Sequence, residues 1–312
     1  MNDLQRYIVE EWAEEFRQGR LPRREFLRRM AIMAGGAALA VPLLHSVGVT
    51  ATQAELTEAL AMGPQIVAQA TGITVPPTDP AIEVSDITYA RTGGADPNVG
   101  YLARPRADGP HPGVIVIHEN RGLLEHFKDV ARRFAKEGYV ALAVDLVATP
   151  GGTARLSDAA QATATLGQTP PDRLVSMLRD AFRRIQEVPG IRRDRIGAIG
   201  WCFGGGMTWR FVTQEPGLRA AAPFYGPNPP MADVPNIRAA VLAIYGALDE
   251  RINAGIPQIR EALQRANVVH EIHIYPNAPH AFFNDTGANY RREAAEDAWR
   301  RVLGWFERHL KA

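Results

Sequence analysis

Residues 196–206 read Ile196-Gly197-Ala198-Ile199-Gly200-Trp201-Cys202-Phe203-Gly204-Gly205-Gly206, and this stretch decides the fold. An apolar run that is typical of a buried strand leads into a cysteine flanked by glycines, and a helix-competent sequence follows. The pattern G-x-C-x-G predicts a sharp turn from strand to helix, in which side chains at the glycine positions would collide with the two elements. Such a turn places the Cys202 sulfur at a helix N-terminus, where backbone N–H groups favour the thiolate. By itself, the stretch equally fits a buried structural cysteine.

Short β-branched runs alternate with helical periodicity around this turn. The predicted strands are Ile82–Tyr89, Val99–Arg104, Val114–His118, Val140–Asp145, Ile196–Gly200, Ala221–Tyr225, Ala240–Tyr245 and His270–Tyr275. The predicted helices are Leu124–Glu137, Asp172–Glu187, Gly204–Gln214, Ile256–Ala266 and Asn289–His309. Alternation of this kind predicts an α/β fold with a mostly parallel central sheet and helices on both faces. The first two strands are separated only by a turn, which predicts an antiparallel hairpin at the start of the sheet.

Two further residues follow predicted strands at the edge where Cys202 is expected. Asp249 comes just after the strand that ends at Tyr245, and His280 comes after the strand that ends at Tyr275. Ligands bind at the carboxyl ends of the strands in open α/β sheets. A base within reach of a thiol, itself oriented by an acid, is the arrangement that activates a nucleophile. The order nucleophile, acid, histidine therefore predicts a Cys202, Asp249, His280 triad, although each residue alone also fits a structural role.

The composition excludes several classes of protein. The chain has 312 residues, of which 46% are hydrophobic and 22% charged, with 35 basic and 34 acidic side chains spread along it. These values indicate a globular protein and no nucleic-acid partner. The single cysteine excludes an intramolecular disulfide. No metal or nucleotide is predicted, because His118-Glu119 lacks the second histidine of a zinc helix and no Lys-Ser/Thr follows the glycines after Cys202.

Residues 1–54 resemble a twin-arginine export signal. Arg23-Arg24-Glu25-Phe26-Leu27-Arg28 is followed by an uncharged stretch rich in alanine and glycine from Met30 to Leu44, and small residues would fit cleavage after Ala51 or Ala54. The apolar run is shorter than the roughly 20 residues of a membrane span. The resemblance implies an exported protein, periplasmic or extracellular, that meets the export machinery and touches the membrane only through this segment. Without cleavage it would remain tethered to the membrane.

An alternative for the same segment is an amphipathic N-terminal helix followed by a buried apolar helix. It is favoured by the acidic residues before the arginine pair, which export signals rarely carry: Asp3, Glu10, Glu11, Glu14 and Glu15. The predicted organisation is a signal or anchor segment at 1–54, a linker with a short helix at 55–80, and a catalytic domain at 81–312.

The stretch from about Asp86 to Leu310 resembles dienelactone hydrolase (carboxymethylenebutenolidase) and its relatives, cysteine hydrolases of the α/β-hydrolase fold. The matching motifs are Val114-Ile115-Val116-Ile117-His118-Glu119-Asn120-Arg121-Gly122, Gly200-Trp201-Cys202-Phe203-Gly204-Gly205, Gly246-Ala247-Leu248-Asp249 and Pro279-His280-Ala281-Phe282. The resemblance implies that Glu119 tunes the switch between thiol and thiolate. It also implies an oxyanion hole formed by the backbone N–H groups of Asn120 and Phe203. From the sequence alone, Glu119 is equally a structural carboxylate.

The chain departs from that family at the substrate carboxylate. In that family two arginines clamp the carboxylate of the substrate, and Thr149 and Asn284 occupy the matching positions of this sequence. A hydroxyl or an amide does not replace a bidentate guanidinium, so the dienelactone itself is not the expected substrate. Arg121, Arg155 and Arg291 are candidate substitutes, but each also fits a solvated surface position. The region from Thr149 to Thr169 fits either a mobile cap or an ordered wall.

The sequence therefore predicts a hydrolase of small-molecule esters or lactones that forms an acyl-enzyme on Cys202 and needs no cofactor. A second hypothesis is an exported binding or scaffold protein that keeps the fold without turnover. A thiol redox protein is a weaker third, because the chain offers no resolving cysteine. The oligomeric state is not indicated.

Overall fold

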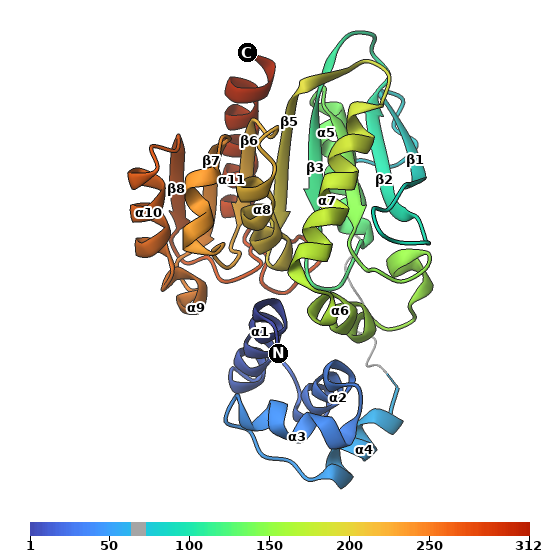
Figure 1. Ribbon diagram of the computed structural model, residues 1–312, viewed down its shortest axis with the longest axis vertical. Helices are drawn as coiled ribbons and strands as arrows, with labels where there is room; N and C mark the ends of the chain where they lie inside the picture. The colour runs from blue at the N-terminus through green and yellow to red at the C-terminus, as the bar shows by residue number, and fades with distance from the viewer. Residues whose placement is uncertain (64–72) are drawn as a thin grey trace.

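The computed structural model describes residues 1–63 and 73–312, and an eight-stranded sheet forms its centre (Figure 1). The strand order is β1-β2-β4-β3-β5-β6-β7-β8. The strands are β1 (Ile82–Tyr89), β2 (Asn98–Pro105), β3 (His111–Ile117), β4 (Val140–Asp145), β5 (Ile191–Trp201), β6 (Ala220–Phe224), β7 (Ala240–Gly246) and β8 (His270–Tyr275). β2 pairs antiparallel with both β1 and β4, and the strands from β4 to β8 run parallel. The predicted hairpin and the α/β-hydrolase fold are confirmed.

Helices cover both faces of this sheet. α7 (Pro171–Gln186) and α8 (Phe203–Gln214) pack on one face, and α5 (Glu125–Lys136) and α11 (Arg292–Phe306) on the other. The rings of Phe134 in α5 and Trp299 in α11 lie 4.6 Å apart between their centroids. The remaining helices and turns of the domain are η1 (Gly152–Arg155), α6 (Ala159–Gln168), η2 (Met231–Asn236), α9 (Glu250–Asn253), α10 (Ile256–Arg265) and η3 (Glu307–Lys311).

The structure differs from the sequence-based expectations mainly at element ends. β5 begins at Ile191, five residues before the predicted start at Ile196. The sequence does not indicate this extension, because Arg192–Arg195 are not buried and have no apolar pattern. The last helix begins at Arg292 instead of Asn289. Within the region from Thr149 to Thr169, η1 and α6 are helical, and α6 packs against the first two helices of the chain. Asp158 caps α6 by accepting a hydrogen bond from the N–H of Ala160.

The first 61 residues fold as four helices, α1 (Asp3–Arg17), α2 (Arg23–Ala34), α3 (Ala37–His45) and α4 (Gln53–Ala61). Figure 1 places α1 nearest to the sheet, with α2, α3 and α4 beyond it. α1 buries an apolar face formed by Leu4, Tyr7, Ile8, Val9 and Trp12. The apolar stretch is broken where Gly35 ends α2 with a left-handed φ of 82°. The amphipathic helix of the alternative is therefore present, but the apolar helix α3 buries only Ala40 and Leu44 and leaves Leu39 64% exposed.

In the part of the chain that the structure describes, no single helix is long and apolar enough to cross a membrane. The bent pair α2 and α3, whose axes differ by 108°, has the length and composition of a broken span. The predicted boundary after residue 54 falls inside α4, and part of the predicted 55–80 linker, residues 64–72, lies outside the described residues. The division into three parts remains a prediction.

Candidate active site

Cys202 lies in the turn between β5 and α8, as the glycine pattern predicts. Its φ of 57° is in the left-handed region that side chains rarely adopt. The turn is so tight that a Cβ on Gly200 would lie 2.3 Å from the carbonyl oxygen of Gly204. A Cβ on Gly204 would lie 2.4 Å from the carbonyl oxygens of Ile117 and His118. Glycine is therefore required on both sides of the cysteine.

Asp249 and His280 meet at the carboxyl end of β7. Asp249 is only 3% exposed, and its Oδ2 lies 2.5 Å from Nδ1 of His280. This contact occupies Nδ1 and leaves Nε2 on the side of Glu11, at 3.6 Å from its carboxylate, and a ring nitrogen of His280 lies within 4.8 Å of the sulfur of Cys202. The ring of Tyr225 packs on the imidazole, with 5.0 Å between centroids. The structure thus brings the three residues of the predicted triad together.

The sulfur is covered by the N-terminal segment. Cys202 is 2% exposed, and the hydroxyl of Tyr7 lies 3.4 Å from its Sγ. The two carboxylate oxygens of Glu11 lie 3.5 and 3.7 Å from the same atom. Glu11 Oε1 also lies 3.6 Å from Nε2 of His280, and Glu11 Oε2 accepts a hydrogen bond of 3.1 Å from the side chain of Asn120. Helix α1 therefore supplies a carboxylate between the nucleophile and its base.

These surroundings keep the thiol protonated. Burial raises the pKa of Cys202 to about 11, and the negative charge of Glu11 adds to that rise, although His280 acts against it. For His280, burial disfavours the charged ring, but the charges of Asp249 and of an ionised Cys202, together with hydrogen bonds to both, outweigh burial and raise the pKa well above the usual value. A thiol with so high a pKa is a weak nucleophile at neutral pH.

Glu119 bonds Asn284, and its negative charge also contributes to the raised pKa of Cys202. Its Oε2 accepts a hydrogen bond of 2.9 Å from the amide of Asn284. Within the described residues, 1–63 and 73–312, Glu119 forms no hydrogen bond with Cys202. Asn284 in turn accepts hydrogen bonds from the backbone N–H and the hydroxyl of Thr286. One of the two positions expected to hold an arginine therefore holds the partner of Glu119.

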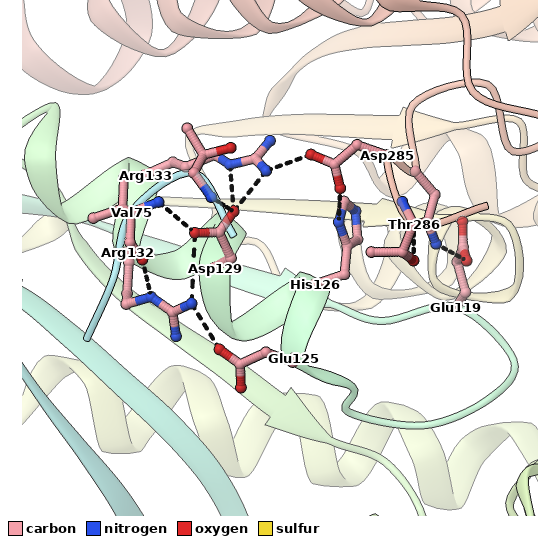
Figure 2. Close-up of polar contacts among 11 residues, drawn as sticks. Val75, Glu119, Glu125, His126, Asp129, Arg132, Arg133, Asp285 and Thr286 are labelled. Atoms are coloured by element: carbon pink, nitrogen blue, oxygen red, sulfur yellow. Dashed lines mark hydrogen bonds and ion pairs between the residues drawn. The ribbon is translucent and has the colours of Figure 1, made fainter. Parts of the chain in front are cut away.

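The loop that carries Asn284 is fixed to helix α5 through its neighbour Asp285. Figure 2 shows Asp285 between His126 and Arg133, at 2.9 and 2.7 Å, and Arg133 continuing to Asp129 at 2.7 Å. Asp129 also accepts hydrogen bonds from the backbone N–H groups of Thr74 and Val75. The loop is positioned by charge-assisted hydrogen bonds, which are stronger than neutral ones.

The remaining predicted residues have simpler places. Phe203 is the first residue of α8 and fully buried. Thr149 has a buried hydroxyl without a hydrogen-bond partner in the described part of the chain. Arg291 bonds the backbone oxygens of Asn289 and Tyr290 at the surface, and Arg155 is exposed. Burial raises the pKa of Glu15 in α1, and the positive charge of the half-buried Arg121 acts against that rise. Arg121 therefore interacts electrostatically with the N-terminal segment.

Sequence reasoning missed Tyr7 and Glu11. The signal available was the excess of acidic residues before the arginine pair, which pointed to a folded helix but not to its target. With Glu11 present, the site also offers three kinds of metal ligand, because carboxylate, thiol and imidazole atoms of Glu11, Cys202 and His280 lie within 4.8 Å of one another. The positions of the single cysteine and of the histidines along the chain do not reveal this set.

Comparisons with known proteins give the family of the chain and agree with its fold. The profile of the dienelactone hydrolase family matches residues 99–310. A protein of Methylorubrum extorquens named "Putative carboxymethylenebutenolidase" is 35% identical over 222 residues, which is 67% of this chain and 76% of that protein. One of the same name from Escherichia coli K12 is 35% identical over 221 residues, 67% of this chain and 82% of that protein.

Among solved structures, the crystal structure titled "Putative Dienelactone Hydrolase" from Klebsiella pneumoniae superposes with a TM-score of 0.67 at 33% identity. The match covers 73% of this chain and all of that one. The chain belongs to the dienelactone hydrolase family, whose class is the hydrolases of ester and lactone bonds.

Proposed function

We propose that the protein hydrolyses small-molecule esters or lactones with Cys202 as the nucleophile. The observation that carries the proposal is the arrangement at the carboxyl end of the sheet, in which a ring nitrogen of His280 lies within 4.8 Å of the sulfur and the ring is oriented by Asp249 at 2.5 Å. The sulfur attacks the acyl carbon, and His280 takes the thiol proton and delivers it to the leaving alcohol. Water, activated by His280, then breaks the thioester and releases a carboxylate. The backbone N–H groups of Asn120 and Phe203 are the proposed donors to the oxyanion.

The substrate class follows from what surrounds the site. Asn284 and Thr149 offer no guanidinium for a substrate carboxylate, which supports an uncharged ester or lactone over a dienelactone acid. The proposed chemistry needs no metal or cofactor, because Cys202 and His280 act as nucleophile and base.

A pre-steady-state assay of the full-length protein tests the nucleophile. With p-nitrophenyl acetate and intact-mass detection, the wild type should gain one acetyl group on Cys202 only as fast as the N-terminal segment uncovers the sulfur, Glu11→Gln should gain it faster, and Cys202→Ala should gain none. Cys202→Ser keeps the shape of the side chain and controls for packing, so it should stay folded with much slower turnover. Equal turnover in wild type and Cys202→Ala would disprove the proposal.

A non-catalytic binding role is the second candidate, and the covered sulfur favours it, since Cys202 is 2% exposed. This role predicts no acetyl adduct on Cys202 in the wild type or in any variant that uncovers the sulfur. The variants of Glu11 and Arg251 described below supply that comparison.

We also propose that residues 1–54 direct export to the periplasm or beyond. Arg23 and Arg24 are both exposed at the start of α2, which supports their recognition by another protein. In a bacterial host, replacing both by lysine should leave the protein in the cytoplasmic fraction, while Arg20→Lys, an exposed change nearby, should not alter export. The same fractionation, with intact masses, shows whether cleavage occurs after Ala51 or Ala54. Cytoplasmic retention of the wild type would contradict export.

A further inference from the structure

Helix α1 occupies the place where a substrate has to bind. Figure 1 shows it against the edge of the sheet at which β5, β7 and their loops end. Its side chains Tyr7 and Glu11 contact the sulfur of Cys202, and Glu11 also faces His280. A cleft of about 540 Å³ lies outside α1, but it is lined by Glu10, Glu14, Arg17, Glu250 and Arg251, and none of the three triad residues lines it. While α1 is in place, Tyr7 and Glu11 cover the sulfur of Cys202, which is 2% exposed.

The group that fills this place resembles the product of the reaction. Hydrolysis of an ester leaves a carboxylate between the nucleophile, the base and the donors that stabilised the oxyanion. The carboxylate of Glu11 lies 3.5 Å from the sulfur of Cys202 and 3.6 Å from Nε2 of His280, and it accepts a hydrogen bond from Asn120. An intramolecular carboxylate competes with substrate at a high effective concentration.

The charge of Glu11 also acts on the nucleophile itself. Burial and this charge together hold the pKa of the Cys202 thiol at about 11, so little thiolate exists at neutral pH. The hydroxyl of Tyr7 completes the cover, and Arg251 lies over the Tyr7 ring at 4.7 Å from its centroid.

The segment that carries Glu11 is docked by specific contacts. Arg251 in α9 pairs with Glu14 at 3.2 Å, and Arg210 in α8 pairs with Asp3. The side chain of Asn2 donates to the backbone oxygen of Gly167 at the end of α6. These polar contacts surround the buried apolar face of α1, and the buried pair of Arg28 with Asp158 adds to them. Loss of a few of them can therefore shift the segment toward an undocked state without unfolding the domain.

We propose that the chain with α1 docked is a latent form of the hydrolase, in which Glu11 blocks Cys202 and His280 as an internal mimic of the product carboxylate. The inference rests on the proposed function and adds its regulation. Undocking of α1, or its removal with the first 54 residues, exposes the site.

Glu11→Gln in the full-length protein tests the inference. The amide keeps the shape of the side chain and removes its charge, so alkylation of Cys202 by iodoacetamide at neutral pH should rise by about tenfold, the change that one pKa unit of the thiol would produce. The KM for p-nitrophenyl acetate should fall more than kcat changes, because a competitor is weakened. Glu10→Gln is the matched control, since Glu10 is exposed on the same helix and its variant should behave as wild type.

Arg251→Ala provides a second test that leaves Glu11 and the triad intact. Loss of its pair with Glu14 and of its contact with Tyr7 should loosen α1 and also raise the alkylation rate, by several-fold, with an unchanged fold by circular dichroism. If neither Glu11→Gln nor Arg251→Ala exceeds the Glu10→Gln control, the latent form is disproved. A fall in kcat for Glu11→Gln at unchanged alkylation would likewise overturn the inference, because Glu11 would then assist the reaction.

The two proposals fail in different ways. Turnover that persists in Cys202→Ala removes the proposed nucleophile whatever the Glu11 variants do. A Cys202-dependent acetyl adduct whose rate is the same in wild type, Glu11→Gln and Arg251→Ala keeps the proposed function and removes the latency.

Discussion

At the scale of single residues, the glycines beside Cys202 determine whether the turn can form. In Gly204→Ala the new Cβ would lie 2.4 Å from two backbone oxygens, which cannot move aside as a side chain can. We expect a loss of about 1–3 kcal/mol in the free energy of unfolding, measured by urea denaturation. Gly304→Ala is the control, because Gly304 lies within α11 with nothing within 4 Å of a new Cβ. It should gain about 0.5–1 kcal/mol, and a similar gain in Gly204→Ala would contradict the tight turn.

The same scale shows what a sequence can reveal about a site. Cys202, Asp249 and His280 could be predicted, because each follows a strand and the strands share one edge of the sheet. Glu11 could not, since it reaches the sulfur from a helix 191 residues away along the chain. An acidic residue in an amphipathic helix has the same local pattern whether it faces solvent or a cysteine.

At the scale of elements, helix α5 fixes the loop that carries Asn284. Burial opposes the charge of Asp285, but hydrogen bonds and charge from His126 and Arg133 outweigh it and hold its pKa below the usual value. The native state therefore gains stability from the ionised Asp285 above the unfolded pKa of about 3.9, and loses it as the pH falls through the lower folded pKa. Asp285→Asn should cost about 1–3 kcal/mol near neutral pH, and the difference from wild type should shrink in acid.

Thermal unfolding of the wild type and of Asp285→Asn, from pH 7 down to the acid range, measures how the difference in stability depends on pH. Asp86→Asn removes a pair with Lys128 of the same helix at a carboxylate that is 79% exposed, so its effect should be within about 1 kcal/mol at every pH. A constant difference between wild type and Asp285→Asn across the range would contradict the ionic role of Asp285.

Elements were more predictable than the contacts between them. β1, β4 and β8 have the bounds that the sequence indicates, because apolar or β-branched patterns end there at polar or turn residues. The sequence does not indicate helix α6, because its small residues, such as Ala162, Ala164 and Gly167, carry little periodic signal. Its order comes from tertiary contacts, including Met33 of α2, which packs against Gly167.

At the scale of the whole molecule, the N-terminal segment and the catalytic domain share a buried ion pair. Arg28 in α2 is 4% exposed and reaches Asp158 at 2.7 Å and Glu25 at 3.0 Å. Removing one partner of a buried pair typically costs about 3–5 kcal/mol, because the other charge stays buried without compensation. When the segment undocks, both Asp158 and Glu25 reach water and no longer need Arg28. Loss of Arg28 should therefore weaken the docking of the segment more than it lowers the stability of the folded domain.

Arg28→Gln should therefore release the segment while the sheet stays folded. We expect faster tryptic cleavage within residues 1–63, a higher rate of Cys202 alkylation, and a retained cooperative melting transition of the domain. Arg24→Gln changes an exposed residue of the same helix and should match wild type in all three measurements. If α1 covers Cys202 as proposed, releasing the segment must also expose the sulfur. Faster cleavage of the segment in Arg28→Gln without any rise in alkylation would therefore show that α1 does not control access to Cys202.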